Sequence, residues 1–347
     1  MLYGILAASS ALLLAAVLTG LLRMPALRLG IVDRRWRRPM PLSGGAAVVA
    51  ATCVVAAVGD RQGVTPLGPE AGRLLVAGAG VALLGLVADV LRVKARFLVG
   101  GTSVAAACVV PYEETGVLAG ILAVGWIVFV ALGFKALDHA DGLAGTVGVV
   151  TAFGAAACAA AEVMDGLAVL LSVLAAALTG FLMHNWHPAR AGLGACGALF
   201  TGFVLASAAV TTRAGQDLGS NAAVLFALSA LVAADVVLVV LARRLSGRSL
   251  LRPGPDHLAH RLRRLGLTPQ GASVLLGVTA FGGVLVAVLV HLGWIAASGV
   301  LWVVGGVLVL VVGLLLVRPR VKPAARSGVV PRPASPQVTT QLRVRNG

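Results

Sequence analysis

Long apolar runs, separated by short segments that hold most of the charged residues, dominate this chain of 347 residues. The runs are rich in Ala, Leu, Val and Gly and lack strict alternation, so they predict helices rather than strands. A helix needs about 20 apolar residues to cross a hydrocarbon core of about 30 Å. About eleven runs approach this length: 2–22, 44–59, 74–90, 97–110, 116–134, 145–162, 167–183, 193–211, 221–242, 272–292 and 295–317. Those at 44–59 and 97–110 are short for independent spans.

Composition places the chain among integral membrane proteins. Its mean hydropathy is +0.98 and 12% of its residues are charged, whereas soluble domains carry about 25% charged residues. We therefore expect an all-α, polytopic membrane protein. The net charge of +15 suits anionic lipid headgroups, and because no recognition motif accompanies it, nucleic acid is not an expected partner.

The basic residues fall in alternate loops. One set of loops holds residues 23–38, 92–96, 135, 190 and 243–264 and the segment after 318, whereas the other holds only Arg61, Arg73 and Arg213. The positive-inside rule then puts the N-terminus outside and the C-terminus in the cytoplasm of a plasma-membrane protein. Residues 1–317 form the predicted transmembrane domain. Residues 318–347 are basic and rich in Pro, and predict a disordered cytoplasmic tail.

Few acidic residues occur on the predicted cytoplasmic side, and ionisable groups near a membrane tend to mark function. They are Asp33, Asp89, Asp138, Asp141, Asp235 and Asp256. Asp138 and Asp141 are three residues apart, a spacing that places two carboxylates on one face of a helix. They can share a Mg²⁺ ion whose other ligands are substrate phosphates and water. The alternative is that Lys135 only neutralises Asp138.

A second polar segment reads Asp256-His257-Leu258-Ala259-His260-Arg261. Arginine binds phosphate oxygens through two N–H groups at once, and imidazoles can donate to further oxygens. His257 and His260 would share one face if the segment is helical. The alternative is a basic surface loop that contacts lipid headgroups.

These segments resemble, in order and spacing, the motifs of the polyprenyl-phosphate N-acetylhexosamine-1-phosphate transferases (glycosyltransferase family 4). The family's acidic motif is Asn-x-x-Asn-x-x-Asp-Gly-x-Asp-Gly, which 135–145 resembles, and its loop motif is His-x-His-His-Arg, which 257–261 resembles. A third family motif, Asn-x-x-Pro-Ala-x-x-x-x-Gly-Asp-x-Gly, is similar to 185–197. The resemblance runs from about Asp33 to about Gly271.

The resemblance implies a cytoplasmic site that transfers a sugar phosphate from a UDP-N-acetylhexosamine to polyprenyl phosphate and releases UMP, in the synthesis of lipid intermediates for cell-envelope glycans. It implies Mg²⁺ as cofactor, and polyprenyl phosphate and membrane lipids as partners. A second copy of the chain and other envelope-synthesis proteins are further candidate partners. The implied roles are catalysis for Asp89 and Asp141, phosphate binding for Asp138, Asp256, His257, His260 and Arg261, and metal binding for Asp138 and Asp141.

Four positions depart from the family pattern, and all four are alanine. They replace the first of two adjacent aspartates, the last aspartate of the acidic motif, the aspartate that is the family's metal ligand, and one loop histidine: Ala88, Ala144, Ala195 and Ala259. We therefore expect a family member with impaired catalysis. The alternatives are an active, divergent Mg²⁺-dependent transferase, and a transporter of lipid-linked sugars or a scaffold. For a transporter, only Asp235 approaches the mid-span polar residue that is needed.

Overall fold

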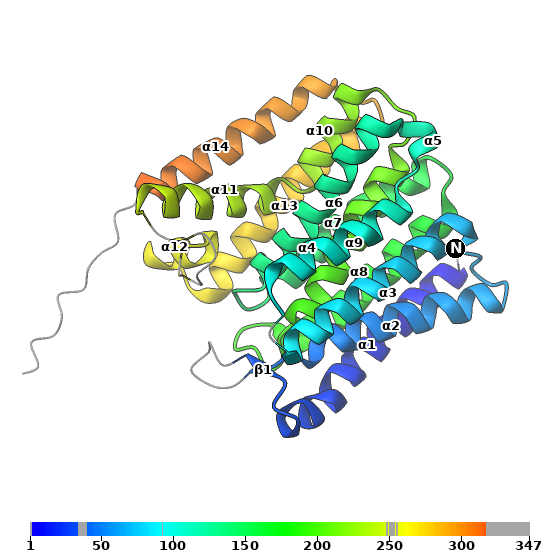
Figure 1. Cartoon of the computed structure of the whole chain (residues 1–347), viewed down its shortest axis with the longest axis horizontal. Helices are drawn as coiled ribbons and strands as arrows, with labels where there is room; N and C mark the ends of the chain where they lie inside the picture. Colours follow the sequence, from blue (N-terminus) through cyan, green and yellow to red (C-terminus); the bar gives the residue numbers. More distant parts are fainter. Residues whose placement is uncertain are drawn as a thin grey trace, which may run out of the picture. The chain divides into compact units, whose positions relative to one another are not determined.

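The computed structural model describes residues 2–33, 40–91, 93–247, 249, 254 and 256–316. These residues form α-helices, one short 3₁₀ helix and one pair of two-residue strands (Figure 1). The all-α prediction is thus confirmed. The predicted tail, residues 318–347, lies outside the described residues, as do the arginines of segment 34–39.

The helices follow one another with short connections. In chain order they are α1 Leu2–Arg28, α2 Ser43–Arg61, α3 Gly68–Leu91, α4 Ala95–Val109, α5 Tyr112–Thr115, α6 Val117–Leu137, α7 Leu143–Ala161, α8 Asp165–Asn185, α9 Gly194–Thr212, α10 Leu218–Leu228, α11 Ala230–Leu245, α12 Leu258–Arg264, α13 Pro269–His291, the 3₁₀ helix η1 Ala297–Gly299, and α14 Val300–Leu316. The strands β1 Val32–Asp33 and β2 Met40–Pro41 pair antiparallel, with Val32 opposite Pro41.

In the described part of the chain, nine helices are long and apolar enough to cross a membrane, or ten if α10 and α11 together make one span. The doubt about 44–59 was wrong, because α2 extends over 19 residues. The run at 97–110 is indeed short, and forms the 15-residue helix α4. The run at 221–242 is not one straight helix, since the chain bends by 75° between α10 and α11. The orientation in the membrane stays a prediction.

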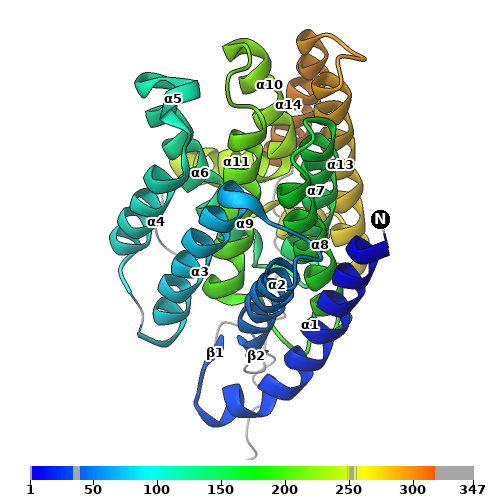
Figure 2. The same cartoon turned by 90° about the vertical axis from the view of Figure 1, so that its right-hand side faces the viewer.

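Helix α9 is the most enclosed of the spans. Of its apolar window 94% is buried, against 17% for α1 and for α14. It packs against α2, α3, α6 and α7, while α1 packs on α8 and α14 packs on α11. The long helices run side by side (Figure 2). Whatever fixes the position of α9 therefore fixes the helices that surround it.

Two glycines let α2 and α3 reach the first turn of α9. A Cβ atom on Gly85 of α3 would lie 2.5 Å from the carbonyl oxygen of Ala195 and 2.7 Å from Cα of Cys196. A Cβ atom on Gly45 of α2 would collide with the backbone of Leu193 and Gly197. Small residues at such crossings allow direct backbone contact between membrane helices.

We expect the substitution Gly85→Ala to destabilise the protein, because the added methyl group has no space against the backbone of α9. Overpacking of this kind costs about 1–3 kcal/mol. Gly80→Ala in the same helix is the matched control, since a Cβ atom there meets nothing within 4 Å and alanine favours helix by about 1 kcal/mol. Unfolding in mixed micelles measures both. Equal stability of the two variants would contradict the close contact of α3 with α9.

Candidate functional site

Two carboxylates from neighbouring helices accept hydrogen bonds from the first turn of α9. Asp89, near the end of α3, accepts from the backbone N–H of Ala195 at 2.9 Å and of Cys196 at 3.0 Å. Asp138, which follows α6, accepts from the backbone N–H of Gly194 at 2.8 Å. The first N–H groups of a helix have no partner within the helix, and its N-terminus attracts negative charge. Asp89 and Asp138 supply both the acceptors and the charge.

The sequence of α9 explains why its cap comes from elsewhere. The residue before the helix is Leu193, which makes no side-chain cap, and the first turn contains no acidic residue. Gly194 has φ of +68°, and a Cβ atom there would lie 2.7 Å from Asp89 Oδ2. Only glycine combines this conformation with a carboxylate so close. The first turn of α9 therefore requires α3 and α6 in place.

Asp141 serves a different part of the site. Its Oδ2 atom lies 2.6 Å from Nδ1 of His187 and accepts the backbone N–H of Ala189 at 3.2 Å. Its backbone carbonyl accepts from the hydroxyl of Ser273 at 2.8 Å. The Oδ1 atom is buried without a hydrogen-bond partner. Asp141 thus joins the turn before α7 to the loop after α8 and to the start of α13.

The predicted pairing of Asp138 with Asp141 on one helix face was wrong. Helix α6 ends at Leu137, and Gly142 adopts φ of +73° before α7 begins. The two carboxylates lie in the turn between these helices and accept from different partners, α9 and the loop after α8. The expected i, i+3 geometry needed one continuous helix, which the Asp-Gly turn interrupts.

Asp89, Asp138 and Asp141 do not belong to a cluster of three metal-binding side chains in the described part of the chain. Asp89 and Asp138 are occupied as helix caps, and Ala195 has no side-chain donor. Apart from Asp141 Oδ1, which is buried without a partner, both oxygens of Asp89 and the Oδ2 atoms of Asp138 and Asp141 already accept hydrogen bonds, so the protein offers few ligands for the Mg²⁺ ion that the resemblance implies.

In the loop before α12, Asp256 and Arg261 contact other parts of the protein. Asp256 Oδ2 lies 3.4 Å from Nε of Arg243, and both side chains are buried. Arg261 donates from Nη1 to the carbonyl oxygen of Leu314 at 2.7 Å and from Nε to that of Asp256 at 3.2 Å. Burial lowers the pKa of Arg261. These bonds tie α12 to α11 and α14, and Arg261 would have to leave them to bind a phosphate through the same N–H groups.

Three histidines gather where this loop meets the turn after α6. The ring of His257 stacks on that of His139, with centroids 4.1 Å apart and planes at 21°. The ring of His260 lies 5.0 Å from that of His139. Asp235 of α11 fixes the position of His257. One carboxylate oxygen is hydrogen-bonded to Nδ1 of His257 at 2.8 Å, and the other accepts the backbone N–H of Leu258 at 2.8 Å.

The helix that was the condition for His257 and His260 to share one face begins only after His257, whose backbone is extended, yet the two ring centroids lie 6.3 Å apart. The sequence motifs gave no role to His139 and His187, and Asp235 was considered only as one of the cytoplasmic acidic residues and as the mid-span residue of a transporter. Their partners lie far away in the chain. The sequence offered one indication of a role for His139 and His187, because they lie within the family motifs at 135–145 and 185–197.

Burial disfavours the charged form of two imidazoles in this group. Burial lowers the pKa of His139 to about 3. Burial and the neighbouring His257 lower the pKa of His260. The Nε2 atom of His139 and the Nδ1 atom of His260 are buried without hydrogen-bond partners. Both rings therefore carry a ring nitrogen that is shielded from water and unpaired.

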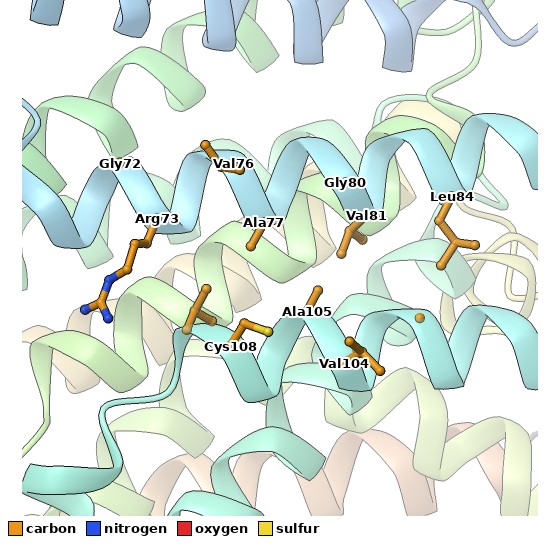
Figure 3. Close-up of a pocket in the computed structure, with 12 residues that line it drawn as sticks. Gly72, Arg73, Val76, Ala77, Gly80, Val81, Leu84, Val104, Ala105 and Cys108 are labelled. Atoms are coloured by element: carbon orange, nitrogen blue, oxygen red, sulfur yellow. The ribbon is translucent and has the colours of Figure 1, made fainter.

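An apolar groove of about 700 Å³ lies between α3 and α4. Figure 3 shows Ala77, Val81 and Leu84 of α3 facing Val104 and Ala105 of α4 across it. Leu84 lies at the end of the groove toward which α3 continues to Asp89, and Arg73 lies at the opposite end. The groove thus leads along α3 toward the first turn of α9.

Comparison with known proteins settles the family. The model of glycosyl transferase family 4 matches residues 72–213, from α3 to the end of α9. A Streptomyces coelicolor protein described as a glycosyltransferase is 63% identical over 321 residues, 91% of this chain and 78% of the relative. The decaprenyl-phosphate N-acetylglucosaminephosphotransferase of Mycolicibacterium smegmatis is 30% identical over 302 residues, 79% and 68% of the two chains. This chain belongs to glycosyltransferase family 4.

A further relative, the phospho-N-acetylmuramoyl-pentapeptide-transferase of Rubrobacter xylanophilus, is 31% identical over 229 residues, 63% of this chain and 66% of the relative. The resemblance found in the sequence motifs is therefore confirmed at the level of the family of polyprenyl-phosphate sugar-1-phosphate transferases. The matched region contains Asp89, Asp138, Asp141 and Ala195. The region of this chain that matches the family model thus includes the first turn of α9, its two capping carboxylates and Ala195.

We expect Asp89→Asn to destabilise the protein by about 1–2 kcal/mol, the usual cost of losing a helix cap. The side-chain amide of asparagine has one oxygen that can accept an N–H of α9. Its NH₂ group would face the second N–H, and two donors cannot form a hydrogen bond with each other. Asp165→Asn, a substitution at an exposed first-turn residue of α8, is the control and should change stability by less than about 0.5 kcal/mol. Unfolding in mixed micelles would refute the capping role if Asp89→Asn behaved like the control.

Proposed function

We propose that this protein is a family 4 member of the plasma membrane that binds polyprenyl phosphate and a UDP-N-acetylhexosamine on its cytoplasmic side, and transfers the sugar phosphate slowly or not at all. The observation that carries the proposal is the capping of α9 by Asp89 and Asp138 beside Ala195. The relatives' names supply the substrate class, since one acts on decaprenyl phosphate and N-acetylglucosamine phosphate.

Electrostatics explains why this arrangement should slow the reaction. Transfer brings the phosphate of the lipid against the diphosphate of the nucleotide sugar, and their negative charges have to be neutralised, usually by a metal ion. At position 195 alanine provides no ligand. Asp89 and Asp138 already accept backbone N–H groups of α9, so a cation would have to share these carboxylates with the helix or displace its N–H groups. Each N–H left unpaired there would cost about 1–3 kcal/mol.

Magnesium is then expected to arrive with the nucleotide sugar rather than to reside in the protein. Phosphate oxygens and water can fill most of its octahedron, so that one carboxylate suffices. Asp141 Oδ1, buried without a partner, is the oxygen of this chain best suited to contact such an ion. The same atom favours the second candidate function, an active transferase with weaker metal binding.

The lipid chain has a suitable surface in the groove between α3 and α4. That groove is lined by small and aliphatic side chains, including Val76, Leu84 and Val104. A prenyl chain lying there would place its phosphate near the end of α3, where Asp89 meets α9. The prenyl chain would therefore contact side chains other than those that transfer requires.

The proposal is tested with the purified full chain, Mg²⁺, a radiolabelled UDP-N-acetylhexosamine and polyprenyl phosphate. We expect saturable binding of polyprenyl phosphate together with UMP release at least about 100-fold slower than that of the Mycolicibacterium relative in the same assay, a loss of about 3 kcal/mol of transition-state stabilisation. UMP release as fast as that of the relative would reject impaired catalysis and establish the second candidate.

The variant Ala195→Asp extends the same test. An aspartate at the start of α9 would lie beside Asp89 and form a pair of carboxylates. Such a pair should bind Mg²⁺, so the variant should gain thermal stability as Mg²⁺ is added, by about 2.7 kcal/mol at 100 times the dissociation constant. Ala195→Asn is the matched control and should show no such gain. Equal responses of the two variants would mean that position 195 does not control metal binding.

A further inference from the structure

Three side chains that commonly bind metal ions converge from separate parts of the chain. His139 lies in the turn after α6, Asp235 in α11, and His257 directly before α12. One ligand atom from each residue lies within 4.8 Å of the other two. Family membership does not supply this set, because the residues assigned from the motifs place Asp138 and Asp141, not this group, at the metal.

His139 presents a nitrogen that is ready to bind a metal. Its Nδ1 atom lies 2.8 Å from the carbonyl oxygen of Ala136. Since a carbonyl only accepts, Nδ1 carries the proton and Nε2 carries the free lone pair. Nε2 is buried and has no hydrogen-bond partner. A hydrogen bond from one ring nitrogen to a backbone carbonyl is the usual way in which proteins orient a histidine toward a metal.

Asp235 supplies the negative charge of the group. It is 1% exposed, and a carboxylate so buried needs charge or hydrogen-bond partners. In the structure Oδ1 accepts the N–H of Leu258, and Oδ2 lies 2.8 Å from Nδ1 of His257. A cation that binds both Oδ2 and Nδ1 would replace the proton between these atoms, and that proton would be released to solvent.

We propose that His139, Asp235 and His257 form a binding site for a transition metal ion of the zinc class, distinct from the carboxylates at the start of α9. Two imidazoles and one carboxylate are ligands that zinc accepts, whereas magnesium prefers oxygen atoms alone. Zinc bonds of about 2.0–2.1 Å place neighbouring ligand atoms about 3.3 Å apart. The stacked rings of His139 and His257 therefore have to separate and turn, as the more distant ligand atoms close by up to about 1.5 Å and the Asp235–His257 pair, now 2.8 Å apart, opens slightly.

The fourth ligand is His260 or water. The ring of His260 lies 5.0 Å from that of His139, and its Nδ1 atom is buried without a partner. A bound ion would cross-link the turn after α6, helix α11 and the loop before α12. It would fix the loop that carries His257 whether or not the protein transfers sugar phosphate, so this inference is independent of the proposed function.

The test measures metal content, not activity. The purified full chain in detergent is stripped with a chelator, loaded with Zn²⁺, and separated from free metal by gel filtration. We expect about one zinc ion per chain, and at least a tenfold lower content in His139→Leu. His184→Gln is the matched control, because His184 is a partly buried histidine that contacts the carbonyl oxygen of Ala16 outside the group. It should keep the zinc.

Spectroscopy of the unsubstituted protein makes the test independent of the folding of any variant. X-ray absorption of the zinc form should show nitrogen and oxygen ligands at about 2.0–2.1 Å, with two imidazoles if water is the fourth ligand and three if His260 is. The Co²⁺ form should show the intense visible bands of a tetrahedral site. Absence of these bands, zinc content no higher than in His139→Leu, or equal loss in His184→Gln would overturn the proposal.

Discussion

Three N–H groups at the start of α9 point away from any acceptor in their own helix, and Asp89 and Asp138 are the side chains that satisfy them. Unpaired backbone groups cost several kcal/mol where water is excluded, and α9 is the most enclosed span of the protein. These hydrogen bonds form only if the ends of α3 and α6 lie level with the first turn of α9. Gly85 and Gly45 allow α3 and α2 to come close enough. The packing around α9 therefore depends on a pair of carboxylates at one end of the bundle.

The same carboxylates determine what the site can do. In the proposed function, the reaction gathers negative phosphates around a cation, and that cation would have to share the carboxylates of Asp89 and Asp138 with backbone N–H groups. Under the same proposal, alanine at 195 supplies no metal ligand, and Asp89 and Asp138 stay on the helix. Asp141 differs, since its Oδ1 atom is buried and unpaired. The three acidic residues of the site thus have different roles. Asp89 and Asp138 cap a helix, whereas Asp141 keeps an oxygen that could bind a cation.

Much of the architecture could be predicted because membrane helices are recognised by length and hydropathy alone. The sequence could not show the bend between α10 and α11, since Ser229 is neither glycine nor proline and the apolar run continues through it. The positions of Asp89, Asp141 and His257 followed from the motifs. Their partners did not, because the first turn of α9, His187 and Asp235 are brought to them by packing between distant segments. The pairing of Asp138 with Asp141 failed for a local reason, the turn at Gly142.

Hydrogen exchange at the backbone amides of Gly194, Ala195 and Cys196 tests the central claim most directly, because these three N–H groups are the ones that Asp89 and Asp138 bind. Exchange is followed with the purified protein, with and without millimolar Mg²⁺ and a UDP-N-acetylhexosamine. We predict that the three amides are strongly protected and that protection does not change when the metal and the nucleotide are added. Faster exchange on addition of Mg²⁺ and nucleotide would show that the carboxylates leave the helix for the metal, and would contradict the account.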